Sequence, residues 1–305
     1  MSDLKKINRL GEVTSSWLKD TVNNVTIKKI HYDNPKYELE KIISGDTSDI
    51  LSISTEVDSL GFWYLINYED KVINDGIYTL DNLGVSAKYF MSRILFREGA
   101  VKFGKEHVLL KTEAAFTFSL LFILGWYEEA NRIGGRLLSG IDSKLLDLRI
   151  NDRHSAGKLF KHFWFLLNLY TKTFKKPSID TSLYSYPDDM SPYQKILNNW
   201  DVKDLSKVNL YVSEMAEYHI AQAKTPAHHE VFEFDSNTVK LFPYEILAYL
   251  RMREWVGLKN PESFDHPLMQ YPLAKMPDKP VVIPETPLLD QVIEIFKREF
   301  PGSFS

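Results

Sequence analysis

The chain has 305 residues, enough for one large domain or for two domains of roughly 150 residues each. Hydrophobic residues make up 44% of it and charged residues 26%, ordinary proportions for a globular protein, which argues against general disorder. The formal net charge of −4 disfavours direct binding to nucleic acid, and the absence of cysteine excludes disulfide bonds and thiolate zinc sites.

Residues 1–35 are polar and are predicted to form an N-terminal arm. Its only strand-like run is VTIKKIHY, which could be one edge strand or no regular element. The start of the chain lacks the apolar centre of a signal peptide. The longest apolar run, Ala114 to Trp126, is interrupted by Thr117 and Ser119 and is too short to cross a bilayer. We therefore expect a cytoplasmic protein with no membrane partner.

A helical pattern begins at Lys36. The run KYELEKIISG ends at Gly45, and the next residues can cap a helix over residues 48–74, where apolar residues recur every three or four positions. Asp75 and Gly76 then predict a turn. Further helices are predicted over residues 83–102, 112–132 and 152–174, with a loose turn at Gly134 and Gly135, and together these segments form a predicted N-terminal helical domain, 36–174.

Residues 175–192 are rich in Pro, Ser and Asp and are predicted to be a linker. Beyond it, residues 193–305 form a predicted C-terminal helical domain. Its helices are expected at residues 193–200, 205–223, 241–258 and 288–300, and the Pro-rich text after Asn260 predicts an extended strap, because proline disfavours helix interiors and central strands.

The segment from Leu241 to Leu258 is expected to be the central buried helix, since its apolar residues lie on nearly every side. Pro243 suits a first helical turn, and Gly257 supplies a stop. Arg251 should lie near the buried side, in an ion pair or against a backbone carbonyl. The predicted fold is therefore all-α: an irregular stack of antiparallel helix pairs, similar to helical repeats, with a Pro-rich C-terminal strap.

Candidate metal and catalytic residues are few. His219, His228, His229 and His266 lie near acidic residues, but their spacing does not match a zinc-binding helix, and two adjacent histidines cannot face one site from a regular element. The chain also lacks the motifs of nucleophilic and phosphate-binding sites. We expect a protein that is not an enzyme and needs no metal or cofactor; a metal-dependent hydrolase built from His219, His228, His229 and Glu230 is the least favoured alternative.

The acidic run EVFEFD, residues 230–235, has two interpretations. It can be a solvated loop, as charged runs usually are, or an edge that binds a partner. Phe232 and Phe234 could then be aromatic anchors for that partner, or they could simply hold the loop against the core.

Several short stretches resemble the all-helical immunity proteins of bacterial polymorphic toxin systems, in particular the PoNi-type nuclease-immunity family. These stretches are Trp200 with Asp201, EMAEYHI at 214–220, EFD at 233–235, the FPYEILAYLRMREWVGL helix, DHPLMQYP at 265–272, and LGWYEEA at 124–130. The central helix departs from the more Gly- and Ala-rich text expected in that family.

The resemblance implies a cytoplasmic protein that binds one cognate toxin domain and occludes its active site. If that toxin is a nuclease, its groove should be basic and should attract acidic side chains. The predicted toxin-binding residues are Glu214, Glu217, Glu230, Phe232, Glu233 and Asp235. A helical scaffold or adapter that binds a protein or peptide is the alternative.

Overall fold

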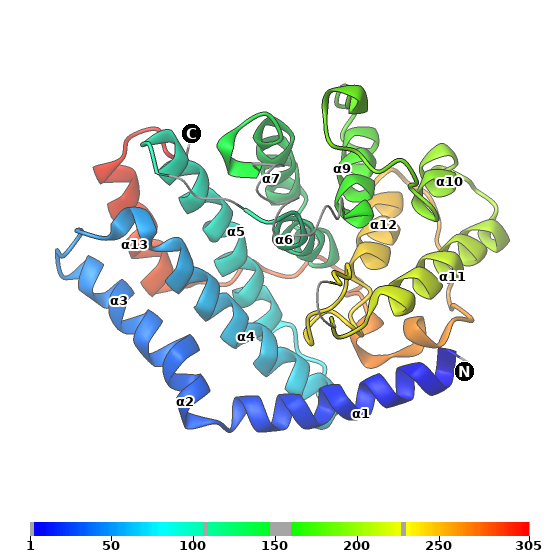
Figure 1. The fold of residues 1–305 in the computed structure, drawn as a ribbon, viewed down its shortest axis with the longest axis horizontal. Coiled ribbons are helices and arrows are strands. Elements are labelled where there is room, and N and C mark those ends of the chain that lie inside the picture. The colour runs from blue at the N-terminus through cyan, green and yellow to red at the C-terminus, as the bar shows by residue number, and fades with distance from the viewer. Residues whose placement is uncertain (1–2, 106–108, 147–159, 227–229, 305) are drawn as a thin grey trace. The chain divides into compact units, whose positions relative to one another are not determined.

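The computed structural model describes residues 3–105, 109–146, 160–226 and 230–304. Every regular element in these ranges is helical, so the prediction of an all-α fold is confirmed (Figure 1). None of the described helices is both long enough and apolar enough to cross a membrane.

The α-helices are α1 (Asp3–Val22), α2 (Val25–Lys28), α3 (Asn34–Ile43), α4 (Ser54–Asn74), α5 (Asp81–Lys102), α6 (Lys111–Ile123), α7 (Tyr127–Gly140), α9 (Lys161–Thr173), α10 (Tyr193–Asn198), α11 (Leu205–Gln222), α12 (Tyr244–Trp255) and α13 (Pro287–Glu299). Short helical turns accompany them: the π-helix η1 (Lys29–Asp33) and the 3-10 turns η2 (Ile50–Ser52), η3 (Lys144–Leu146), η4 (Thr181–Leu183), η5 (Pro267–Gln270) and η6 (Pro272–Ala274).

The chain divides into two compact units, each built from separate segments. Unit 1 contains residues 1–14, 110–139 and 148–280, and unit 2 contains residues 15–109, 140–147 and 281–305. This division differs from the predicted domains, because the predicted linker 175–192 lies inside unit 1. Ring contacts from Trp164 of α9 to Tyr184 and Tyr186 hold that segment, as does an ion pair of 2.8 Å between Lys161 and Asp189.

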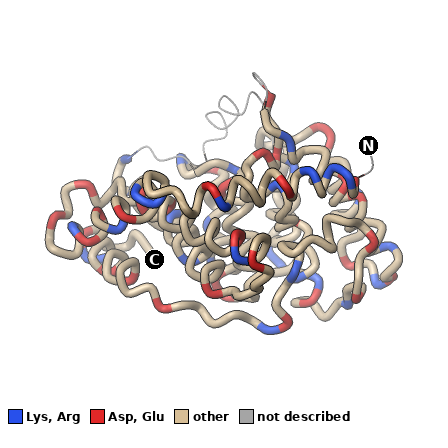
Figure 2. The backbone as a smooth tube through the Cα atoms, turned by 90° about the horizontal axis from the view of Figure 1, so that it is seen from below, with Lys and Arg blue, Asp and Glu red and all other residues tan. Residues whose placement is uncertain are grey.

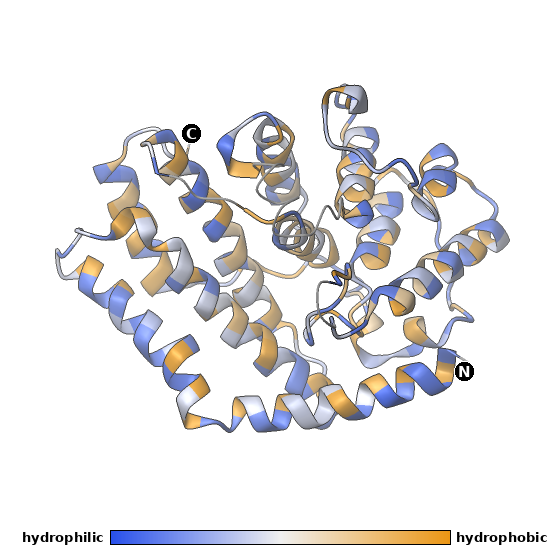
Figure 3. Ribbon diagram, in the orientation of Figure 1, coloured by the Kyte–Doolittle hydropathy of each residue, from blue (hydrophilic) through white to orange (hydrophobic). Residues whose placement is uncertain are grey.

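The predicted N-terminal arm is wrong, because helices cover residues 3–22 and 25–33. Ile7, Thr14, Leu18 and Thr21 are buried along α1, and their spacings of three, four and seven place them on one helical face. Figure 3 shows apolar residues recurring turn after turn along α1. The strand-like run 25–32 falls in α2 and η1, so the polar composition concealed an amphipathic helical segment.

Unit 2 is organised around the pair α4 and α5, which pack closely along their lengths. Gly61 of α4 makes this possible: a Cβ atom there would lie 2.8 Å from the ring of Phe90. On the same side, the hydroxyl of Ser86 donates to the Gly61 carbonyl at 2.8 Å. Helix α13 completes the unit by inserting three apolar side chains among those of α3, α4, α5 and the turn before α4. We call this cluster the α13 core; its buried residues are Leu39, Ile42, Ile50, Ile53, Val57, Leu60, Tyr89, Phe96, Leu289, Val292 and Phe296.

Unit 1 is organised around α12, which contacts α6, α9 and α11. Every residue from Tyr244 to Arg253 is buried, which confirms a central buried helix, although it is shorter than the predicted 241–258 and Pro243 is its N-cap. The helix ends before Gly257, whose φ of +79° is a left-handed conformation that glycine adopts without strain.

Arg251 and Arg253 are both buried and fasten the segment after α12. Arg251 is 7% exposed; it pairs with Glu254 at 2.6 Å and donates to the carbonyl of Pro277, so both predicted roles are found. Arg253 donates to the carbonyls of Trp200, Val202 and Lys259 at 2.8 to 3.0 Å. These bonds fix the beginning of the strap at Lys259 and a point near its middle at Pro277.

The predicted helix 112–132 is divided by Gly125, whose φ of +76° ends α6. Its backbone N–H and that of Trp126 close the last turn on Phe122 and Leu121. The predicted loose turn at Gly134 and Gly135 is wrong, since both glycines lie within α7. For the predicted helix 152–174, residues 161–173 form α9, and residues 152–159 lie outside the described part.

Candidate functional site

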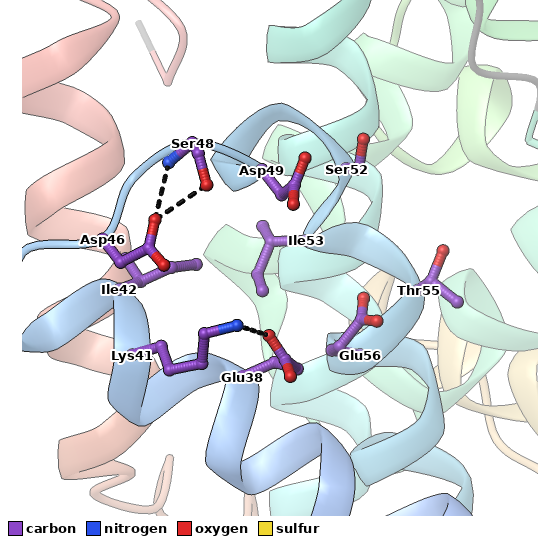
Figure 4. A pocket seen from close by; sticks show the side chains of 10 residues that line it. All are labelled: Glu38, Lys41, Ile42, Asp46, Ser48, Asp49, Ser52, Ile53, Thr55 and Glu56. Atoms are coloured by element: carbon purple, nitrogen blue, oxygen red, sulfur yellow. Dashed lines mark hydrogen bonds and ion pairs between the residues drawn. The ribbon is translucent and has the colours of Figure 1, made fainter.

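A hollow of about 270 Å³ lies in unit 2, between the end of α3 and the beginning of α4 (Figure 4). Helix α3 ends at Ile43, the chain turns through residues 44–49, and η2 leads into α4. The lining residues are Glu38, Lys41, Ile42, Asp46, Ser48, Asp49, Ser52, Ile53, Thr55 and Glu56, and we call this site the acidic pocket.

The floor of the acidic pocket is apolar. Ile42 and Ile53 are each 4% exposed and belong to the α13 core, so they are fixed by packing on their other sides. The walls carry the carboxylates of Glu38, Asp46, Asp49 and Glu56, with Lys41 as the one cation among the lining residues. The acidic pocket therefore has an apolar floor and a strongly acidic rim.

Two of these carboxylates are engaged inside the pocket. The ammonium of Lys41 donates to Glu38 at 2.8 Å, a hydrogen bond that raises the pKa of Lys41. Asp46 accepts from the hydroxyl and the backbone N–H of Ser48 at 2.7 and 3.3 Å, and these bonds lower the pKa of Asp46. Both pairs are drawn in Figure 4.

Glu56 is the carboxylate whose ionised form is disfavoured by its surroundings. Partial burial raises the pKa of its carboxyl group, and the negative charges of Glu38 and Asp49 raise it further. Like charges that crowd a hollow favour a positive ligand, because that ligand removes the repulsion on binding. The pocket can therefore hold a cation whose stem contacts the isoleucine floor.

A bound metal ion is a weaker match for this arrangement. Among the described residues, no group of three or more His, Cys, Asp or Glu side chains is placed to hold a metal ion. A lysine or arginine side chain suits the pocket better, because each has an apolar stem and a cationic head.

The six residues predicted to bind a toxin lie in unit 1, and the structure separates them by burial. Glu217 and Glu230 are exposed. Glu214 is half-buried and pairs with Lys195 at 2.6 Å. Phe232 is half-buried beneath the ammonium of Lys224, and Asp235 is half-buried, so that burial raises its pKa.

Glu233 requires a correction, because it is only 2% exposed and offers no surface to a partner. Its carboxylate lies 2.6 Å from Nδ1 of His162 and accepts from the backbone N–H groups of Lys161 and His162 and from the hydroxyl of Tyr218. Burial alone would raise the pKa of Glu233, but the hydrogen bonds from His162 and Lys161 and the charge interaction with His162 outweigh it and lower the pKa to about 2. Glu233 thus accepts hydrogen bonds from the backbone N–H groups at the start of α9.

Phe234 is also buried, which supports the interpretation that it holds the loop to the core. Its ring stacks on His219 with 3.9 Å between centroids. His219 uses both ring nitrogens internally, toward Glu245 at 2.9 Å and toward the Val239 carbonyl at 3.0 Å. His219 is therefore occupied within the fold, and His228 and His229 lie outside the described residues.

The acidic pocket was not predicted, although its sequence carried a signal. Five acidic residues fall within residues 38–56, on both sides of the turn at Gly45, and four of them line the pocket. A turn that reverses the chain brings the end of one helix beside the start of the next, and so concentrates charges that are spread along the sequence. Figure 2 shows acidic and basic residues distributed along the whole described backbone.

Comparison with family models, with curated proteins and with solved structures found no match for this chain. The chemistry of the site therefore carries the functional argument.

Proposed function

We propose that this protein acts by binding a basic partner protein, and that it is an immunity protein that neutralises a cognate bacterial toxin domain in the cytoplasm. The acidic pocket is the observation that carries the proposal. Its four carboxylates are partly uncompensated, and Glu56 is held at a raised pKa by burial and by its acidic neighbours.

A lysine or arginine side chain from the toxin is the expected occupant. Its stem would contact Ile42 and Ile53, and its charged head would lie between Glu56 and Asp49. Charge-assisted hydrogen bonds of this kind are stronger than neutral ones, and partial burial reduces their screening by salt. The repulsion around Glu56 that destabilises the free protein becomes attraction in the complex.

A toxin that acts on nucleic acid suits this chemistry, because its substrate groove must be basic to hold phosphates. An acidic inhibitor is drawn to such a groove and, once bound, occludes it. Catalysis by the inhibitor is not needed, and one inhibitor blocks one toxin molecule.

Co-expression tests the proposal. A candidate toxin domain, encoded beside the gene for this protein, is expressed in a susceptible bacterium with and without this protein. Survival and the presence of a co-purifying complex are measured. We expect rescue and a one-to-one complex. No rescue together with no complex would overturn the immunity proposal and favour the scaffold alternative.

Two charge reversals identify the surface. The double variant Asp49→Lys with Glu56→Lys should weaken the complex about a hundredfold or more if a toxin cation occupies the acidic pocket. The matched control, Glu217→Lys with Glu230→Lys, reverses two exposed acidic residues of unit 1 and should bind normally. The opposite ranking would place the interface on the surface predicted from the sequence.

The pH dependence gives a second readout for the pocket. Glu56 must be ionised to attract a cation, so affinity should fall as the pH is lowered through its raised pKa. In Glu56→Gln this part of the pH dependence should disappear, and affinity at neutral pH should be lower. Isothermal titration calorimetry between pH 7 and pH 4.5 measures both effects; an unchanged pH profile would contradict the role of Glu56.

A further inference from the structure

A second hollow, of about 520 Å³, lies in unit 1 between the central helix α12 and the strap. Leu247 and Leu250 of α12 form its base and are at most 2% exposed. Phe264, Met269 and Met276 of the strap form its sides and are half-buried. We call this site the strap pocket.

The strap pocket is built on fixed elements. Upstream of it, Arg253 donates to the Lys259 carbonyl and to the side chain of Asn260. Downstream, Arg251 donates to the Pro277 carbonyl. Between these points, residues of the strap line the hollow together with α12. A preformed hollow of this kind costs little ordering when a ligand enters.

The mouth of the pocket is braced and acidic. The side-chain amide of Gln270 donates to the carbonyls of Phe264 and Asp265 at 3.2 and 3.3 Å. Asn209 of α11 donates to the Asp265 carboxylate at 2.7 Å. Glu262 and Asp265 are exposed, and the lining residues include no lysine or arginine.

We infer that the strap pocket binds a short peptide segment of another protein, with a large apolar side chain as the anchor and a lysine or arginine within two positions of it. The apolar side chain would contact the leucines and the two methionines, whose flexible side chains adapt to different shapes. The basic residue would pair with Glu262 and Asp265 at the mouth, where the charge is complementary. This inference does not depend on the acidic pocket or on the immunity proposal.

The anchoring mode has a physical basis in the size of the hollow. A space of this volume is within the range of ligand pockets, and an apolar base with a few polar groups at the rim is their usual composition. A single buried anchor often supplies most of the affinity of a peptide complex. The charged rim would then select among peptides that share the anchor.

A library of random 12-residue peptides displayed on phage tests the inference with the full-length chain. We expect enrichment of peptides that carry Leu, Ile, Met or Phe within two positions of Lys or Arg. The best synthetic peptide is then titrated by fluorescence anisotropy. Failure to enrich any peptide, or enrichment without this pattern, would overturn the inference.

Variants locate the binding site. Met276→Lys places a cation in the hollow and should weaken the selected peptide about tenfold or more, and Glu262→Lys should weaken it to a smaller extent. Val282→Lys and Glu285→Lys are the matched controls, because both residues are exposed and lie beyond the strap pocket. Thermal melting checks that each variant is folded. Equal affinity in Met276→Lys and the controls would show that the peptide binds elsewhere.

Discussion

The buried carboxylate of Glu233 is important for the stability of unit 1. It accepts hydrogen bonds from the first residues of α9, from His162 and from Tyr218, and it is buried. A neutral amide in its place keeps only one of the two accepting oxygens and sets a donor against donors, which is costly in an interior that excludes water. Substitutions of exposed residues usually change the free energy of unfolding much less.

We predict that Glu233→Gln lowers the free energy of unfolding at pH 7 by about 3 kcal/mol. The pKa of Glu233 is lowered in the folded protein to about 2, so its contribution is complete above the unfolded pKa and is lost as the pH falls from about 4.5 toward 2. Urea unfolding across this range measures the loss. The variant should lack this part of the acid sensitivity.

Glu230→Gln is the control for that experiment, because Glu230 is exposed and close in sequence. Its unfolding free energy should stay within about 0.5 kcal/mol of the native protein. Equal stability of the Glu233 and Glu230 variants would contradict the structural role of Glu233.

The contrast between Glu233 and its neighbours also explains a limit of prediction from sequence. The run EVFEFD identifies acidic and aromatic residues but not which of them face the interior. The acceptor role of Glu233 depends on Lys161 and His162, about 70 residues earlier, and no local pattern encodes that pairing. The general prediction for Arg251 was possible because a charge on a helix that is apolar on every side must find a partner.

At the scale of elements, α7 and α9 are in close contact through one glycine. A Cβ atom at Gly134 would lie 2.5 Å from the ring of Tyr170, whereas at Gly135 the nearest atom is at 3.6 Å. Both glycines are within α7, so their helix propensities are equal and only the packing differs.

We predict that Gly134→Ala lowers the free energy of unfolding by about 1 to 3 kcal/mol, because Tyr170 must move. Gly135→Ala should instead raise it by about 0.5 to 1 kcal/mol through better helix propensity. Chemical denaturation of the two variants side by side measures the difference. Opposite signs are expected, and equal effects would contradict the packing argument.

Helix ends were easier to predict than helix partners. Gly45, Gly76 and Gly257 all have positive φ and lie where the sequence indicated a stop or a turn. Gly125 was missed because apolar residues continue on both sides of it and the periodic pattern does not break. The N-terminal helix was missed because its polar residues outnumber the apolar ones that define its buried face.

At the scale of the whole molecule, unit 2 joins residues that are about 200 positions apart. Phe296 of α13 packs edge to face against Phe96 of α5, with 4.9 Å between ring centroids, and both are almost fully buried. Local sequence patterns predicted each helix but could not indicate this pairing, since periodicity shows which face is apolar and not what covers it.

We predict that Phe296→Ala destabilises unit 2 by about 3 to 5 kcal/mol. Hydrogen exchange measured by mass spectrometry should become faster in α3, α4 and α5 as well as in α13, because these helices share one core. Phe300→Ala is a milder control, since Phe300 is only partly buried. Faster exchange confined to α13 would contradict a shared core.

The acidic pocket also depends on this long-range assembly. Ile42 and Ile53 are held from behind by the α13 core, so the floor of the pocket takes its shape from residues at the other end of the sequence. Composition could indicate an acidic protein and a local concentration of charge. A rigid hollow with an apolar base required the fold itself.

The position of α13 in the chain has a consequence for biosynthesis. Residues 39–96 leave the ribosome long before residues 287–299, so most of unit 2 must wait with its α13-facing side uncovered while unit 1 segments are translated. During that interval the nascent helices expose Leu39, Val57 and Phe96 to other chains and to chaperones. Translation speed and chaperone supply, as much as the finished contacts, should therefore set the yield of active protein.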